Sequence, residues 1–211
     1  MVPFIIGGAV VATIVGGVIA YLASDDEPKK NTDLPIKHAT IVLLGMEGAG
    51  KSTLSHILEG KGYQSGNEYT TPSGRTFEIN VDICGIQYTI LDSSGVKENA
   101  GSREEARKKL ANLTEEKRKK SIFIYVFDAE DFVDREDRRE EILLQARTHF
   151  DEAMEYRIIM KCLGTRRDKI SGAERDSVVA RIRKAVNVDT EIFDMTINPV
   201  EQIKEFISRE V

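Results

Sequence analysis

The amino-acid sequence predicts an α/β domain in which helices cover both faces of a mostly parallel, six-stranded sheet with one antiparallel edge strand. Strand-like and helix-like segments alternate from residue 37 to the C-terminus, which is the order of a doubly wound, three-layer fold. A glycine-rich loop over residues 45–50 joins the first strand to the first helix. Two further strand-like runs meet at Gly85 and predict an antiparallel hairpin.

The elements follow from hydrophobic periodicity and from helix-start signals. Apolar or β-branched runs predict strands at residues 39–44, 75–84, 86–92, 121–128, 156–164 and 190–197. Helices are expected from Lys51 to about Glu59 and from Ser102 to about Lys120. Further helices are expected around residues 142–154, after Ser171 with Val178, Val179, Ile182 and Val186 facing inward, and from Pro199 with Ile203, Phe206 and Ile207 facing inward. Two of these helices begin with capping-box spacing, at Ser102 with Glu105 and at Ser171 with Glu174. Asn198, Pro199 and Glu201 are expected to serve as the N-cap, N1 and N3 residues of the last helix.

Helical spacing also predicts which side chains face the core. In the helix before residue 156, the expected inward positions are Ile142, Leu143, Ala146, Phe150 and Met154. Cys84 and Cys162 lie in apolar runs without metal-binding spacing, so both are expected to be reduced core thiols. The net charge of -5 and the pI of about 5.4 argue against a surface for nucleic acid.

An uncharged segment precedes the domain. Residues 1–24 carry no charged side chain, and this length suffices for a helix to cross a bilayer. We expect a single transmembrane anchor helix, with residues 3–23 in the bilayer and residues 25–36 as a polar linker to the domain at 37–211. A cleaved signal peptide is the main alternative, but no basic region precedes the apolar run. Lys29, Lys30 and Lys37 follow the segment, which places the domain on the cytosolic side.

The loop after the first strand has the spacing of a phosphate-binding loop. Gly45 is followed by four residues and then by Gly50, Lys51 and Ser52, which matches G-x-x-x-x-G-K-[ST]. Backbone N–H groups of such a loop surround phosphates at a helix N-terminus. Lys51 would reach the β- and γ-phosphates, and the Ser52 hydroxyl would ligate Mg²⁺. A glycine-rich turn without chemical meaning is the alternative, which the flanking strand and helix disfavour.

Three further segments narrow the identity of the ligand. Asp92 ends a predicted strand, where a carboxylate can hold Mg²⁺ through water, and Gly95 follows it as a γ-phosphate sensor. Thr70, or alternatively Thr71, lies in a polar loop from which its hydroxyl could close over the metal. Asp168 follows another strand, and its carboxylate can accept hydrogen bonds from guanine N1–H and the exocyclic amine. Each residue also has a purely structural reading, as a strand-end cap, loop filler or surface charge.

With these motifs the sequence resembles the small GTPase superfamily over residues 37–211. The stretch GMEGAGKST is most similar to the Arf branch and to the β-subunit of the signal recognition particle receptor, which also has one N-terminal membrane span. The resemblance implies GTP/GDP and Mg²⁺ as cofactors. It implies metal contacts at Ser52, Thr70 and Asp92, and catalytic roles for Lys51 and Gly95. The nucleotide-binding residues that it implies are Glu47, Gly48, Ala49, Gly50, Lys51, Ser52, Thr53, Thr70, Gly95, Thr165, Arg166, Asp168, Thr196 and Ile197.

The sequence departs from the family pattern at two places. Thr165 and Arg166 stand where the base-reading motif Asn-Lys-x-Asp usually has asparagine and lysine, and the Arg166 stem would lie over the base as the lysine does. Val96 replaces the glutamine that usually orients the attacking water. Intrinsic hydrolysis is therefore expected to be slow without a partner.

Two functions remain open at this point. One is a membrane-anchored GTPase switch that recruits an effector and depends on an exchange factor or activating protein. The other is a nucleotide-locked adaptor with little or no hydrolysis. Gly8, Ala12 and Gly16 recur at every fourth residue, which favours self-association of the anchor or reflects only the composition of such segments.

Overall fold

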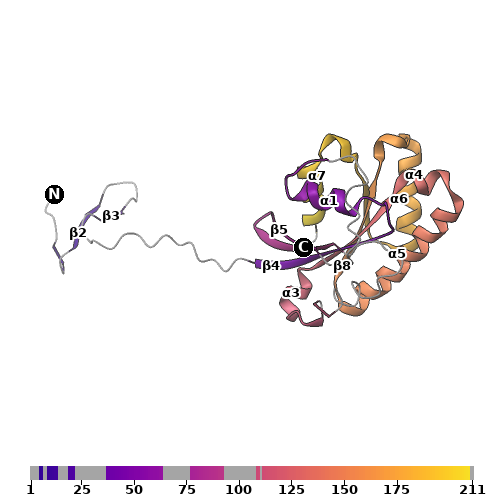
Figure 1. The fold of residues 1–211 in the computed structure, drawn as a ribbon. Helices are drawn as coiled ribbons and strands as arrows, with labels where there is room; N and C mark the ends of the chain where they lie inside the picture. Colours follow the sequence, from indigo (N-terminus) through magenta and orange to yellow (C-terminus); the bar gives the residue numbers. More distant parts are fainter. Residues whose placement is uncertain are drawn as a thin grey trace. The chain divides into compact units, whose positions relative to one another are not determined.

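A computed structural model of the 211-residue chain describes residues 5–6, 9–13, 19–21, 37–63, 77–92, 108–109 and 111–209 (Figure 1). The chain divides into two compact units, residues 1–35 and 36–211.

In the first unit, the described residues form short antiparallel strands. These are β1 (Ile5–Ile6), β2 (Ala9–Thr13) and β3 (Ile19–Tyr21), and Ala12 pairs with Ala20. At these positions the backbone is extended where a helix was predicted, and β-branched residues such as isoleucine, valine and threonine favour that conformation. The rest of the predicted anchor lies outside the described residues. No helix within the described ranges combines the length and the apolar character that a membrane span requires.

The second unit contains the predicted six-stranded sheet. Its strand order is β5-β6-β4-β7-β8-β9, and β5 alone runs antiparallel to its neighbour. The strands are β4 (Lys37–Leu44), β5 (Phe77–Ile83), β6 (Ile86–Asp92), β7 (Ile122–Asp128), β8 (Ile159–Thr165) and β9 (Asp189–Ile192). This confirms the predicted topology, including the antiparallel edge strand.

The hairpin between β5 and β6 turns at Cys84 and Gly85. Both residues have positive φ, 52° and 79°, as a two-residue type I′ turn requires. The Cys84 side chain is exposed, so its expected place in the core was wrong. An apolar run continues through Cys84 in the sequence, but the chain has already left the sheet there. Cys162 is buried as predicted, and burial raises the pKa of its thiol.

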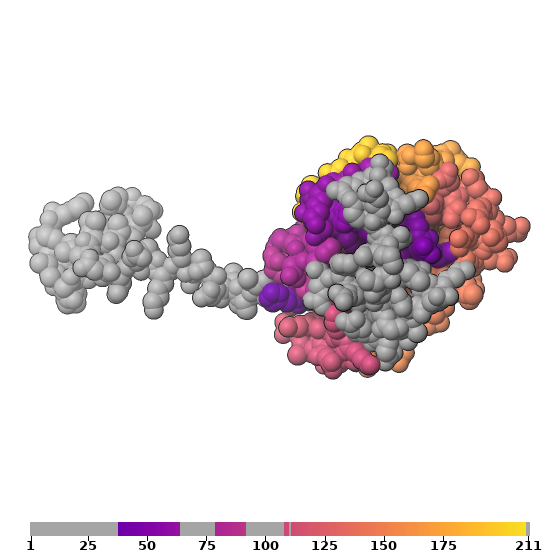
Figure 2. Space-filling model, viewed as in Figure 1, coloured from indigo at the N-terminus to yellow at the C-terminus, as the bar shows by residue number. Residues whose placement is uncertain are grey.

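Helices cover both faces of the sheet. On one face lie α1 (Lys51–Leu58) and α7 (Val200–Ser208), and on the other lie α4 (Ala129–Asp134), α5 (Glu136–Tyr156) and α6 (Gly172–Val186) (Figure 1). Strand β4 serves both layers, because Ile41 and Leu43 pack toward α1 and α7 while Val42 and Leu44 pack toward α5 and α6. Figure 2 shows the surface of residues 37–63, in indigo and purple, beside that of α7, in yellow.

The helix faces differ in part from the predicted ones. In α5 the buried residues are Ile142, Ala146, His149 and Ala153, whereas the Met154 side chain is 62% exposed. The buried stripe includes a histidine because its ring packs against Tyr125, with 5.7 Å between ring centroids. In α6 the predicted positions Val178, Ile182 and Val186 are buried.

Helix starts follow the predicted signals at one site and not at others. Ser171 and Glu174 form the expected capping box of α6. The predicted continuous helix to Lys120 is interrupted, because Thr114 caps a separate helix, α3 (Glu115–Lys119). Ser102 and Glu105 lie outside the described residues. Helix α7 begins after Pro199, one residue later than predicted, since Asn198 has a left-handed backbone (φ 52°).

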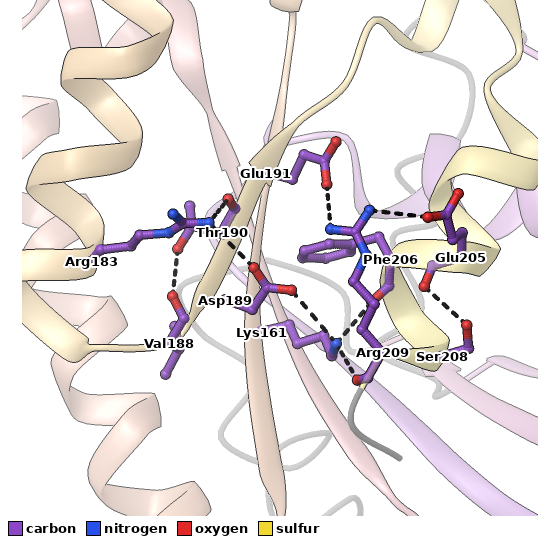
Figure 3. A network of polar contacts seen from close by, with 10 residues as sticks. All are labelled: Lys161, Arg183, Val188, Asp189, Thr190, Glu191, Glu205, Phe206, Ser208 and Arg209. Carbon is purple, nitrogen blue, oxygen red and sulfur yellow. Dashed lines mark hydrogen bonds and ion pairs between the residues drawn. The ribbon is translucent and has the colours of Figure 1, made fainter.

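A buried lysine ties the end of α7 to the sheet (Figure 3). The Lys161 side chain on β8 is fully buried, and its Nζ donates to the carbonyl oxygens of Phe206 (2.8 Å) and Arg209 (2.6 Å). These carbonyls lie at the C-terminus of α7, where helical partners are missing. Asp189, the register partner of Lys161 on β9, contributes a carboxylate 3.8 Å away. The last helix is thereby fixed to β8 and β9.

Candidate functional site

The predicted site residues follow strands whose carboxyl ends meet at one edge of the sheet. Pairing aligns Leu43 with Asp92 and Asp128 with Thr165, so β4, β6, β7 and β8 all end there. The loop after β4 lies between the ends of β6 and β7. Parallel α/β sheets bind ligands at this kind of edge, where the chain leaves adjacent strands toward opposite faces.

The loop over residues 45–50 needs its glycines. Gly45 has φ 133°, and a Cβ there would lie 2.0 Å from the carbonyl oxygen of Val126. Gly50 has φ 95°, and a Cβ there would lie 2.9 Å from Thr165 Cγ2. Gly48 also has positive φ, 77°. The glycines therefore let the loop turn sharply while packing against β7 and the end of β8.

Lys51 and Ser52 stand at the start of α1, where the loop ends. The Lys51 side chain is only 6% exposed. Its Nζ curls back over the loop and donates to the carbonyl oxygens of Gly45 (2.9 Å) and Met46 (2.7 Å). Ser52 is the second residue of the helix and is half-buried. The arrangement places an ammonium group and a hydroxyl group beside the N–H groups of a helix N-terminus, which suits a phosphate with a bound cation.

The remaining loop residues differ in exposure. Glu47 is exposed, Ala49 is buried and Thr53 is half-buried. The structure therefore places Glu47 on the solvent side of the phosphate loop.

The last residue of β8 contacts the phosphate loop directly. Thr165 Oγ1 lies 3.1 Å from the carbonyl oxygen of Ala49 and 3.3 Å from that of Phe127. A threonine thus links the loop to the segment predicted to contact the base, at the place where the family pattern has asparagine. The backbone N–H of Arg167 also donates to the carbonyl of Phe193, at 3.3 Å. These bonds bring the predicted phosphate-binding and base-reading segments together.

Asp168 lies in a 3-10 helix, η2 (Arg167–Lys169), directly after Arg166. Asp168 is exposed, and its Oδ2 lies 3.4 Å from Lys169 Nζ. The carboxylate is accessible to a ligand that approaches the sheet edge.

The last predicted segment follows β9. Thr196 and Ile197 lie in a 3-10 helix, η3 (Met195–Ile197). Asp194 Oδ1 accepts from the backbone N–H of Thr196 (2.9 Å) and from its hydroxyl (2.5 Å). The Ile197 side chain is 65% exposed. Phe193, just before this turn, contacts the end of β8, because its backbone N–H donates to the Gly164 carbonyl oxygen at 2.8 Å.

Two acidic residues that the sequence analysis missed complete the site. Asp128, at the end of β7, and Glu130, in α4, lie 2.7 Å and 3.0 Å from the Arg166 guanidinium. Burial raises the pKa of Asp128, although the Asp131 N–H and Arg166 oppose the shift. Burial disfavours the Arg166 cation, but Asp128 and Glu130 outweigh this effect and raise its pKa. Asp128 could have been predicted from the sequence, because it is an acidic residue at the end of an apolar strand. No comparable sequence feature pointed to Glu130.

Other predicted residues are only partly described. Asp92 ends β6 beside the loop, but the described part of the structure includes only its backbone. Thr70, Thr71, Gly95 and Val96 lie outside the described residues. Their predicted roles at the metal and the γ-phosphate stay predictions.

Comparison with known proteins supports nucleotide binding at this site. The sequence matches the family described as "50S ribosome-binding GTPase" over residues 40–160, more than half of the chain. It is also 28% identical over 88 residues to a protein named tRNA modification GTPase MnmE from Anaplasma phagocytophilum (strain HZ). The match covers 42% of this chain and only 20% of that relative. The likeness is therefore confined to a part of the relative.

Proposed function

Because the chain belongs to the 50S ribosome-binding GTPase family, we propose that it is a membrane-anchored GTP-binding switch that recruits a partner when loaded with GTP. GTPases of this family use GTP, GDP and Mg²⁺. One observation carries the nucleotide-binding part of the proposal: Thr165 Oγ1 donates to the Ala49 carbonyl oxygen, so the segment predicted to contact the base lies against the predicted phosphate loop. A single nucleotide can then contact both segments.

The residues present fit such a ligand. The turn at residues 45–50 lies beside the buried Lys51, and α1 begins directly behind it, so backbone N–H groups at this helix start would be available to a phosphate. Lys51 and the loop would hold the phosphates, whereas Ser52, Thr70 and Asp92 would hold Mg²⁺. Thr165, Arg166 and Asp168, with Thr196 and Ile197 alongside, would surround the guanine. Mg²⁺, when bound, neutralises charge on the phosphates and so assists cleavage of the terminal one.

Membrane attachment is the finer part of the proposal. Residues 1–24 are uncharged, and in a bilayer each backbone N–H and C=O must find a partner within the segment. Lipid therefore favours a helix for a segment whose β-branched residues favour strands elsewhere. As part of the same proposal, the phosphate-loop sequence and this uncharged segment favour kinship with the Arf branch and the signal recognition particle receptor β-subunit.

The anchor is tested by charge insertion. We expect the full-length protein to stay with membranes after carbonate extraction. The double variant Ile14→Lys/Val18→Lys should be released, because each lysine near the bilayer centre costs about 3 kcal/mol. The control Asp26→Lys adds a cation in the linker and should stay bound. Release of the unmodified protein, or recovery of a shortened chain that starts near Ser24, would contradict the anchor.

Hydrolysis is expected to be slow. Val96 cannot orient a water molecule by hydrogen bonding, and GTPases that retain the glutamine reach only about 10⁻⁴ to 10⁻³ per second without a partner. We expect the protein alone to release phosphate below about 10⁻³ per second. Val96→Gln should raise the rate, whereas Val96→Ala should not, because alanine also lacks a hydrogen-bonding group. Phosphate release is followed over hours with purified, dilute protein.

The same assay separates the two candidate functions. Faster hydrolysis by Val96→Gln supports a switch that lacks only the water-positioning group. No detectable hydrolysis in either protein, together with retained GTP, favours the second candidate, a nucleotide-locked adaptor. Val96 is the observation that favours that candidate. Rapid hydrolysis by the unmodified protein would contradict both the slow switch and the nucleotide-locked adaptor, because each rests on the missing hydrogen-bonding group at Val96.

A further inference from the structure

Arg166 occupies an unusual backbone conformation at the centre of the base-reading segment. Its φ of 58° lies in the left-handed region, where a side chain with a Cβ is disfavoured. Non-glycine residues persist there when the surrounding structure holds them, and such positions concentrate at ligand sites. The contacts that hold Arg166 are therefore of functional interest.

The side chain of Arg166 is held by two carboxylates, one at the end of β7 and one in α4. Arg166 Nε lies 2.7 Å from Asp128 Oδ2, and Nη1 lies 3.0 Å from Glu130 Oε2. The Asp128 side chain is 12% exposed and that of Glu130 is 36% exposed, so water screens the Asp128 contact less. We call Asp128 and Glu130 the acidic clamp.

The clamp is anchored in the rigid part of the fold. Asp128 pairs with Thr165 in the register between β7 and β8, and its Oδ1 accepts from the Asp131 N–H (3.1 Å) as the N-cap of α4. Thr165 holds the other side of the segment through the Ala49 carbonyl. Arg166 is therefore fixed between the phosphate loop and the start of α4.

We propose that Asp128 and Glu130 are positioning residues that set how long the protein keeps its nucleotide. The clamp holds Arg166, and thereby the turn leading to Asp168, in its binding conformation before the base arrives. Such preorganisation lowers the conformational cost of binding. The inference rests on the proposed function, because it concerns the guanine side of the same site.

Two variants separate the charge from the local structure. Asp128→Asn keeps a good N-cap for α4 but removes the charge beside Arg166. Glu130→Gln removes the more exposed contact. We expect GDP to dissociate about tenfold faster from Asp128→Asn, as for a hydrogen bond to a charged group. Glu130→Gln should accelerate release about two- to threefold, since the contact is half-exposed. Release is measured by chasing a fluorescent GDP analogue from the full-length protein.

The controls distinguish positioning from general destabilisation. Asp176→Asn breaks an Arg–carboxylate contact of similar length, 2.9 Å to Arg175 on α6, and should leave the GDP release rate unchanged. Affinity for pyrophosphate should be unchanged in both clamp variants, because the phosphate loop is intact. In the background of Arg166→Met, which lacks the guanidinium, Asp128→Asn should have no further effect on release.

The outcomes are distinct. Faster GDP release with unchanged pyrophosphate affinity, lost in the Arg166→Met background, supports the clamp. Unchanged release in both variants, or an equal effect of Asp128→Asn with and without Arg166, overturns it while leaving GTP binding intact. Equal weakening of GDP and pyrophosphate also overturns it, because the defect would then extend to the phosphate loop. If the unmodified protein binds no GDP, the proposed function itself is wrong.

Discussion

Lys51→Ala is expected to weaken GTP binding by roughly a hundredfold or more. The ammonium group is buried and lies over the loop that would hold the phosphates. Removing one partner of a buried charge pair costs about 2–5 kcal/mol, and each 1.4 kcal/mol is about tenfold in affinity. Isothermal titration with GTP and Mg²⁺ measures the loss.

Two comparisons make the Lys51 result specific. Lys61→Ala removes an exposed lysine just after α1, paired with Glu59, and should leave GTP affinity unchanged. Lys51→Met keeps most of the side-chain volume and should lose as much affinity as Lys51→Ala. Circular dichroism checks that both variants remain folded. Unchanged GTP affinity in a folded Lys51→Ala protein would remove the phosphate loop from the account.

Asp168→Asn is expected to lower GTP affinity by roughly a hundredfold and to change base selectivity. The carboxylate can accept from guanine N1–H and from the exocyclic amine, and charged hydrogen bonds contribute about 1.5–3 kcal/mol each. An amide presents one donor, which faces the exocyclic amine unfavourably. It can instead donate to the exocyclic oxygen of xanthine, so XTP affinity should rise.

Competition titrations with GTP, XTP and ATP test this exchange. Asp176→Asn again provides the control, since its carboxylate is exposed on α6 and should not affect base selectivity. The same GTP preference in Asp168→Asn as in the unmodified protein would contradict the assignment of Asp168 to guanine.

Local patterns predicted most of the fold because its elements carry strong periodicity. The apolar runs of β4, β7 and β8, the hairpin glycine at 85 and the capping box at Ser171 all specify structure within a few residues. Features that depend on tertiary packing could not be predicted in the same way. His149 is buried only because Tyr125 faces it across the sheet–helix interface. Cys84 is exposed because the chain turns before the apolar run ends.

The site divides along the same line. The positions of Lys51 and Ser52 in the candidate site could be predicted from motif spacing alone, because the phosphate loop is one continuous segment. The bond from Thr165 to the Ala49 carbonyl joins residues 116 positions apart. No local pattern in the sequence predicts a contact between residues so far apart. The acidic clamp likewise depends on the pairing of β7 with β8, which places Asp128 beside the segment that follows Thr165.

The central claim is that one guanine nucleotide contacts both the phosphate loop and the base-reading segment. Titration of the unmodified full-length protein with GTP and with ATP, each with Mg²⁺, tests it most directly. The account predicts that GTP binds at least about a hundredfold more tightly, because adenine lacks both donors that Asp168 accepts, each worth about 1.5–3 kcal/mol. Equal affinities for GTP and ATP would contradict the claim.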